Sequence, residues 1–185
     1  MNLANKISIA RILLIPFFIG SIVYYRSEGG LVAYLPLSIF FIAVISDALD
    51  GFIARRFNQK TELGTIIDPM ADKLLIVTAF VALSFSKSIP ENLKLPAWLP
   101  IIVISRDIII VLGALLIHII KGSIQIIPTI WGKITTFLQM STILVVLMKF
   151  PYSFVVWNLA GAFTVLSGID YIIRGSRFLN NENNA

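Results

Sequence analysis

Six apolar stretches, each about 20 residues long, occupy most of this chain and restrict its fold more than any other feature. They cover residues 7–25, 31–53, 69–86, 97–120, 130–150 and 152–173. An α-helix of that length crosses the hydrocarbon core of a bilayer. Hydrophobic residues make up 57% of the 185 residues and charged ones 14%, so one soluble core could not bury them all. We predict an all-α integral membrane protein with six transmembrane helices.

The segments between these stretches are short and contain Gly, Pro and charged residues, which is typical of turns. We find no internal repeat, and little sequence remains for a part outside the membrane. We therefore predict a single membrane-embedded domain over residues 1–185, ending in a polar tail at about 180–185. The chain has no cysteine, so oxygen atoms or the one histidine, His118, must hold any metal.

If the chain crosses the membrane six times, its basic residues are divided unevenly between the two sides of the membrane. Ten fall on one side, namely Lys6, Arg11, Arg55, Arg56, Lys60, Lys73, Lys121, Lys133, Arg174 and Arg177. Four fall on the other, namely Arg26, Lys87, Lys94 and Lys149. By the positive-inside rule we expect a multi-pass protein of the cytoplasmic membrane, with both termini and the 54–72 segment in the cytoplasm. The net charge of +5 then fits contact with membrane lipids, and we expect no nucleic-acid partner.

Four of the six aspartates fall within 26 residues, at Asp47, Asp50, Asp68 and Asp72. The first two are spaced i,i+3 and the last two i,i+4, so each pair shares one face of a helix. The segment between the pairs returns the chain, so the two faces can meet. Carboxylates that converge in a membrane need a neutralising cation. Oxygen ligands without cysteine or histidine nearby favour Mg²⁺ or Mn²⁺, with Ca²⁺ as an alternative.

Small and basic residues flank the acidic pairs. Gly51 and Ala54 lie one turn beyond the first pair, and Gly64 lies one turn before the second. A ligand can approach the backbone at such positions, although helix packing is the preferred explanation for each glycine taken alone. Arg55 adds donors for phosphate oxygens beside the expected cations.

Written in order, residues 47–72 read Asp-x2-Asp-Gly-x2-Ala-Arg-x8-Gly-x3-Asp-x3-Asp. This segment resembles the signature of the CDP-alcohol phosphatidyltransferases at every defining position. The resemblance implies that family's membrane fold, a homodimer, and two divalent cations, Mg²⁺ or Mn²⁺, that bind the pyrophosphate of CDP-diacylglycerol. It assigns metal ligation to Asp47, Asp50, Asp68 and Asp72, and it makes Asp72 the base that deprotonates the acceptor hydroxyl.

The same resemblance implies a cytidine diphosphate site. Its lining residues are Asn5, Ser8, Gly51, Ala54, Arg55 and Gly64. The N-terminal part of this set belongs to the motif Asn5-x2-Ser8-x2-Arg11, in which the family often has Thr in place of Ser8. From the residues alone, this motif is equally well explained as the capped entry of a helix.

Three cations form a candidate acceptor site. Arg106 lies about ten residues into the fourth stretch, too deep to reach water easily, so it needs a partner or a polar cavity. The adjacent Asp107 would point about 100° away on a helix, and a buried structural pair with some other group stays open as an alternative. Lys133 and Lys73, each explained alone as a topology residue, could join Arg106 in binding a phosphate. The stretches Ser105-Arg106-Asp107 and Gly132-Lys133-x-Thr135 are similar to the subgroup that uses glycerol 3-phosphate, which more often has Glu at position 107.

The resemblance therefore implies transfer of the phosphatidyl group from CDP-diacylglycerol to glycerol 3-phosphate, giving phosphatidylglycerophosphate and CMP in phospholipid biosynthesis. Another acceptor, such as serine, inositol phosphate or phosphatidylglycerol, stays open. So do a two-metal lipid phosphatase and a cation carrier. Carriers typically place their coupling residues near the bilayer midplane, whereas these aspartates lie at one edge of the predicted membrane region.

Overall fold

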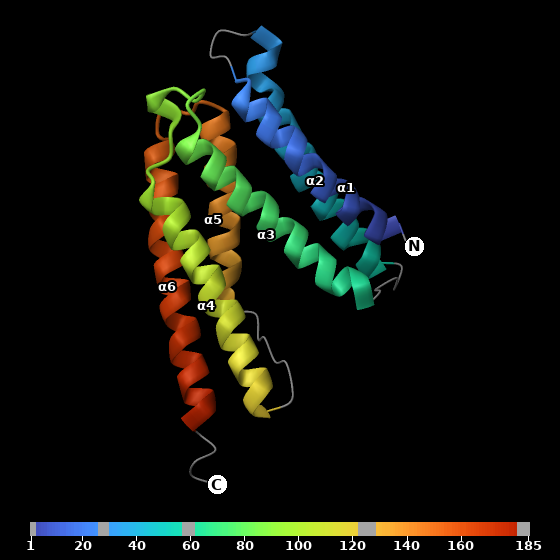
Figure 1. Ribbon diagram of the computed structural model, residues 1–185, viewed down its shortest axis with the longest axis vertical. Coiled ribbons are helices and arrows are strands. Elements are labelled where there is room, and N and C mark those ends of the chain that lie inside the picture. The colour runs from blue at the N-terminus through green and yellow to red at the C-terminus, as the bar shows by residue number, and fades with distance from the viewer. Residues whose placement is uncertain (1–2, 26–29, 57–61, 122–128, 181–185) are drawn as a thin grey trace. The chain divides into compact units, whose positions relative to one another are not determined.

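The computed structural model describes the backbone of residues 3–25, 30–56, 62–121 and 129–180 (Figure 1). These residues form α-helices and short 3-10 helices with no strand, which confirms the expected all-α fold. The elements are α1 (Leu3–Val23), η1 (Gly30–Tyr34), α2 (Leu35–Arg56), α3 (Glu62–Phe85), η2 (Glu91–Leu93), α4 (Trp98–Lys121), α5 (Ile130–Leu147) and α6 (Ser153–Asn180). Each of the six apolar stretches thus contains most of one α-helix.

Four segments of the described chain are long and apolar enough to cross a membrane. They are Gly30–Asp47, Trp98–Ile117, Ile130–Leu147 and Ser153–Arg177, and a shorter apolar helix covers Ile9–Val23. The protein therefore has the character of a multi-pass membrane protein. The count of six crossings stays a prediction.

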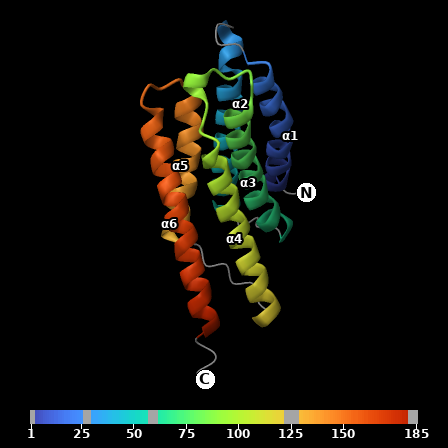
Figure 2. The ribbon, with the colours of Figure 1, turned by 60° about the vertical axis from the view of Figure 1, so that its left-hand side comes forward.

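The chain divides by its contacts into two compact units. The first contains residues 1–96 and 143–150, and the second contains residues 97–142 and 151–185. In the first unit α1 packs against both α2 and α3, and in the second α4 packs against α6. The elements of each unit can be followed in the turned view of Figure 2. A single domain over the whole chain stays a prediction.

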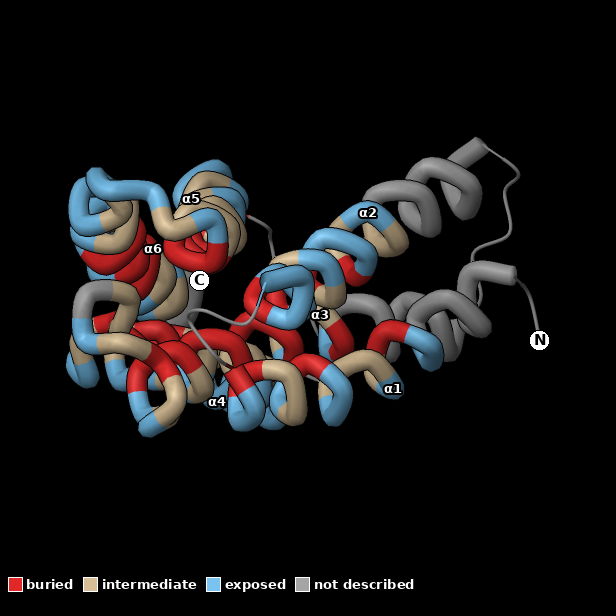
Figure 3. The backbone as a smooth tube through the Cα atoms, turned by 90° about the horizontal axis from the view of Figure 1, so that it is seen from above, coloured by how far each residue is buried: buried red, intermediate tan, exposed pale blue. Residues whose placement is uncertain are grey.

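The core of the first unit is built from aromatic side chains on three helices. Phe18 on α1, Phe40 on α2 and Phe80 on α3 are all fully buried. The rings of Phe18 and Phe40 lie 5.9 Å apart between centroids, a distance at which aromatic pairs attract each other. Buried positions alternate with exposed ones along each helix (Figure 3), and the exposed ones include large apolar side chains such as Leu13 and Phe17. Such an outward apolar face suits lipid rather than water.

The second unit combines close backbone approach with polar contacts between helices. Gly161 on α6 lies so near Trp98 on α4 that an added Cβ would be 2.7 Å from the indole ring. The Thr135 hydroxyl on α5 donates to the backbone oxygen of Phe163 at 3.0 Å, and the Gln139 amide donates to Thr164 Oγ1 at 3.1 Å. Small residues and interhelical hydrogen bonds of this kind are typical of helices that associate in membranes.

Hydroxyl groups within the apolar helices bond to their own helix backbone. Ser46 donates to the backbone oxygen of Ile42 at 2.7 Å, and Thr142 donates to that of Leu138 at 2.8 Å. A polar group without a partner is costly in hydrocarbon, so these bonds let the helices carry polar residues there.

Candidate active site

Arg11 on α1 joins two of the predicted site aspartates. Its Nη1 atom lies 3.0 Å from Oδ1 of Asp47 on α2, and it also forms an ion pair with Oδ1 of Asp72 on α3. The Arg11 side chain is 1% exposed, while those of Asp47 and Asp72 are 35% and 26% exposed. The arrangement follows from the packing of α1 against both other helices. One buried cation is thus shared by two half-buried carboxylates.

The electrostatics of this cluster depend on the shared cation. Two carboxylates drawn together from separate helices repel each other, and partial burial strengthens that repulsion because the effective dielectric constant falls. The guanidinium of Arg11 offsets the repulsion. Its Nε and Nη2 atoms are buried without a hydrogen-bond partner among the described residues.

The other two predicted ligands continue the same helical register. Asp50 follows Asp47 by one turn of α2, and Asp68 precedes Asp72 by one turn of α3. The side chains of Asp50 and Asp68 lie outside the described residues. Among the side chains that are described, no three acidic or histidine residues form a metal-binding group.

The residues predicted to line the cytidine diphosphate site all belong to described helices. Asn5 and Ser8 lie on α1, Gly51, Ala54 and Arg55 on α2, and Gly64 on α3. All six positions therefore lie on the three helices that also carry Arg11, Asp47 and Asp72. Their side-chain positions lie outside the described residues.

A second buried arginine organises the other unit. Arg106 on α4 is 6% exposed, and its Nη2 donates a hydrogen bond of 2.8 Å to Ser167 Oγ on α6. Its guanidinium carbon lies 5.4 Å from the ring centroid of Tyr171, also on α6, which is within the range of a cation–π contact. The Nε atom is buried without a hydrogen-bond partner in the described part of the chain.

The sequence argument was wrong about the direction of Asp107. We expected Asp107 to point elsewhere, yet Nη1 of Arg106 lies 2.9 Å from Oδ1 of Asp107. The arginine side chain is long enough to turn back along the helix surface, so an angular separation of about 100° at the backbone does not keep the two charged groups apart.

The start of α5 lies close to the same guanidinium. Thr129 caps this helix, because its Oγ1 accepts a hydrogen bond of 3.0 Å from the backbone nitrogen of Gly132. A Cβ added to Gly132 would lie 3.1 Å from Nη2 of Arg106, so a glycine permits this close approach. Lys133 follows directly and is exposed.

The three predicted acceptor-binding cations are therefore distributed over both units. Arg106 and Lys133 belong to the second unit, where Lys133 follows Gly132, the residue whose added Cβ would lie 3.1 Å from the Arg106 guanidinium. Lys73 belongs to the first unit, where it follows Asp72 on α3 and is partly exposed.

Sequence reasoning missed three residues of these clusters. Arg11 was assigned only to a motif and to the positive side of the membrane, and Ser167 and Tyr171 were given no role. The signal for Arg11 was the same one that singled out Arg106, a lone cation within an apolar stretch. Ser167 and Tyr171 carry no comparable signal, because a serine and a tyrosine are common in such helices.

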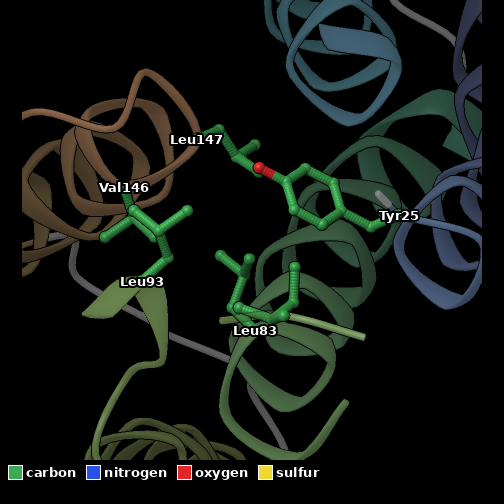
Figure 4. A pocket seen from close by; sticks show the side chains of 6 residues that line it. Tyr25, Leu83, Leu93, Val146 and Leu147 are labelled. Carbon is green, nitrogen blue, oxygen red and sulfur yellow. The ribbon is translucent and has the colours of Figure 1, made fainter. Parts of the chain in front are cut away.

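An apolar pocket in the first unit is lined by none of the predicted site residues. It is lined by Tyr25, Leu83, Ile89, Leu93, Val146 and Leu147. Figure 4 shows the Tyr25 ring extending toward Leu147. Tyr25 follows the C-terminal end of α1, about 20 Å along the helix from Arg11. A pocket with this lining does not suit a nucleotide or a phosphate.

Comparison with known proteins gives a consistent family assignment. Residues 1–166 match the model of the CDP-alcohol phosphatidyltransferase family. A Bacillus subtilis protein named CDP-diacylglycerol--glycerol-3-phosphate 3-phosphatidyltransferase is 33% identical over 199 residues, covering 98% of this chain and 99% of that protein. An Aquifex aeolicus protein of the same name is 33% identical, and the match covers 98% of this chain and 100% of that protein. A Mycobacterium tuberculosis protein described as a "Probable phosphatidylglycerophosphate synthase" is 32% identical, with 95% and 82% covered.

Proposed function

The chain belongs to the CDP-alcohol phosphatidyltransferase family, and from that membership we propose that it transfers a phosphatidyl group from CDP-diacylglycerol to glycerol 3-phosphate. The products are phosphatidylglycerophosphate and CMP. The observation that carries the proposal is the meeting of Asp47 and Asp72, from two different helices, at one positive charge. The names of the Bacillus and Aquifex relatives, which span nearly the whole chain, support glycerol 3-phosphate as acceptor.

The residues at this cluster fit a hard divalent cation. Carboxylate oxygens are the ligands that Mg²⁺ and Mn²⁺ prefer, and two of them already converge on a cationic nitrogen. Asp47, Asp50, Asp68 and Asp72 would hold two such cations. When bound, these cations would neutralise the pyrophosphate and stabilise the charge on the departing CMP.

The protein's own residues would position the substrates and remove one proton. The acceptor hydroxyl oxygen attacks the phosphorus that carries the diacylglycerol group. The bond from that phosphorus to the bridging oxygen breaks, and the bridging oxygen leaves with CMP. Asp72, beside the acceptor, takes the hydroxyl proton as general base. Asn5, Ser8, Gly51, Ala54, Arg55 and Gly64 would line the cytidine diphosphate site.

The acceptor phosphate would be bound by Arg106 and Lys133, with Lys73 as a third donor. A doubly charged acceptor that approaches several carboxylates needs compensating positive charge. The buried Nε atom of Arg106 supports this role, because no described residue accepts a hydrogen bond from it.

We further propose that the active site and both termini face the cytoplasm and that the protein forms a homodimer. The orientation is supported by the ten basic residues on one predicted side against four on the other. The dimer is supported by the family resemblance, and the mass of the purified protein in detergent tests it.

The reaction is tested with purified protein, CDP-diacylglycerol, Mg²⁺ and one acceptor at a time. We expect phosphatidylglycerophosphate with glycerol 3-phosphate, and little product with serine, inositol phosphate or phosphatidylglycerol. A reaction without any acceptor is the control, because release of CMP and phosphatidic acid there would indicate a hydrolase instead. Formation of another lipid would change the acceptor and leave the family assignment intact.

A further inference from the structure

The two buried arginines use their nitrogens in different ways. Arg106 gives one nitrogen to Asp107 and another to Ser167, so each contact has its own donor. Arg11 places Oδ1 of both Asp47 and Asp72 on the single atom Nη1. Its other two nitrogens are buried and have no hydrogen-bond partner among the described residues.

In this geometry Arg11 acts as a single positive charge between two carboxylates. It is not held in one orientation by several hydrogen bonds. Arginine can bind a carboxylate with two parallel hydrogen bonds, and that bidentate arrangement is the one which orients it most firmly. Arg11 forms no such bidentate pair with either carboxylate. The contribution of Arg11 to the cluster is therefore mainly its charge, which a different cation between the same oxygens could supply.

A divalent cation would have to share these oxygens with Arg11. Asp47 and Asp72 are both ligands in the proposed metal site, and their Oδ1 atoms are the ones that Nη1 contacts. Two cations at one pair of oxygens repel each other, and the repulsion is strong in a site as buried as this one. Binding of the metal and the present contacts of Arg11 therefore oppose each other.

We propose that Arg11 is the counter-cation of the metal-free site, which holds Asp47 and Asp72 together until a divalent cation displaces its Nη1 from their oxygens. Arg11 is in this sense a positioning residue, because it acts on the two carboxylates and not on the reacting atoms. The inference rests on the metal site of the proposed function. It predicts that metal binding to the unmodified chain is weakened by competition.

The test measures Mn²⁺ affinity of the purified full-length chain without substrates, with free Mn²⁺ followed by electron paramagnetic resonance. Apparent affinity scales with the fraction of protein in the binding-competent arrangement, so Arg11→Gln should bind Mn²⁺ about tenfold more tightly or better. Arg11→Lys, which keeps a charge but has one terminal nitrogen, should show a smaller gain. Arg106→Gln removes the other buried arginine, which belongs to the second unit, and should leave Mn²⁺ affinity unchanged.

Thermal unfolding provides a second readout that does not depend on activity. In excess chelator, Arg11→Gln should unfold at a lower temperature than the unmodified chain, because two carboxylates face each other without a cation. Saturating Mn²⁺ should remove most of that difference. A purely structural role for Arg11 would instead lower the unfolding temperature equally with and without metal.

Two outcomes are decisive against the inference. If both Arg11 variants bind Mn²⁺ no more tightly than the unmodified chain, Arg11 does not compete with the metal, and the metal site itself remains. If the unmodified chain binds no Mn²⁺, the proposed metal site fails together with the inference. If Arg11→Gln does not fold, the Mn²⁺ affinity of Arg11→Lys decides alone. Tighter binding than in the unmodified chain shows that Arg11 competes with the metal, and equal binding shows that it does not.

Discussion

At the scale of single residues, Asp72 and Asp50 should differ in what their loss removes. Asp72→Asn takes away the proposed base, and a general base contributes typically 10²- to 10⁴-fold to rate, so we expect kcat to fall about 100-fold or more. Binding of CDP-diacylglycerol should remain nearly unchanged. Asp50→Asn should lower both kcat and the binding of CDP-diacylglycerol, because this residue acts only as a metal ligand. Rates and lipid binding of the two purified variants are measured side by side, and near-normal turnover by Asp72→Asn would disprove the base assignment.

The buried arginine of the second unit allows an equally direct test of the acceptor site. Charge-assisted hydrogen bonds contribute about 1.5–3 kcal/mol each, so Arg106→Ala should lower kcat/KM for glycerol 3-phosphate about tenfold or more. Lys133→Ala should act in the same direction. The KM for CDP-diacylglycerol should stay unchanged, which distinguishes a lost acceptor contact from general damage. Unchanged acceptor kinetics in both variants would remove these residues from the site.

Residue identity could be predicted from sequence where spacing carried the information. The four aspartates were found because their i,i+3 and i,i+4 spacing places each pair on one helix face. The ion pairs of Arg11 with Asp47 and Asp72 depend instead on how three helices pack, which no local spacing encodes. The contact between Arg106 and Asp107 was missed for another reason, since it depends on side-chain rotamers rather than on the direction of the Cβ atoms.

At the scale of helices, the close approach of α6 to α4 should be sensitive to a single methyl group. A Cβ at position 161 would lie 2.7 Å from the Trp98 ring, and overpacking of this kind costs typically about 1–3 kcal/mol. We expect Gly161→Ala to lower the unfolding temperature in detergent micelles. Gly113→Ala on α4 is the matched control, because outside its own helix backbone and chain neighbours no atom of the described residues lies within 4 Å of the added Cβ. Equal unfolding temperatures for the two variants would show that Trp98 moves aside freely.

The apolar stretches predicted where the helices lie in the sequence, but they did not predict the residues at which the helices begin and end. The fourth stretch, residues 97–120, corresponds closely to α4 (Trp98–Lys121). The third stretch begins at residue 69, yet α3 begins at Glu62. Hydropathy marks where a segment prefers lipid, whereas a helix continues for as long as its backbone hydrogen bonds do. The polar first turns of α3 therefore could not be predicted from apolar composition.

At the scale of the whole molecule, activity should require a divalent cation. The four carboxylates that we propose as metal ligands would need neutralisation, and the single charge of Arg11 cannot supply it for all of them. We expect exhaustive chelation to abolish lipid synthesis and added Mg²⁺ or Mn²⁺ to restore it. Product formation is measured before and after the metal is returned, with Ca²⁺ as a comparison. Full activity after chelation would contradict the two-cation site.

The absence of cysteine from the sequence makes the orientation directly measurable. Asn58→Cys introduces a single thiol in the segment expected to face the cytoplasm, and Lys87→Cys introduces one on the opposite side. A membrane-impermeant thiol reagent should label Lys87→Cys in intact spheroplasts and Asn58→Cys only in inverted vesicles. Labelling in the reverse order would overturn the positive-inside argument.

The shared ion pair of Arg11 also constrains the order in which the chain can enter the membrane. Arg11 leaves the ribosome well before Asp47, and Asp72 follows 61 residues after it. A guanidinium without a partner is costly in hydrocarbon, so we expect α1 to reach its final depth only when α2 brings the first carboxylate. It acquires the second only when α3 has been synthesised. We therefore expect the last of these three helices to be made to complete the ion pairing of the first.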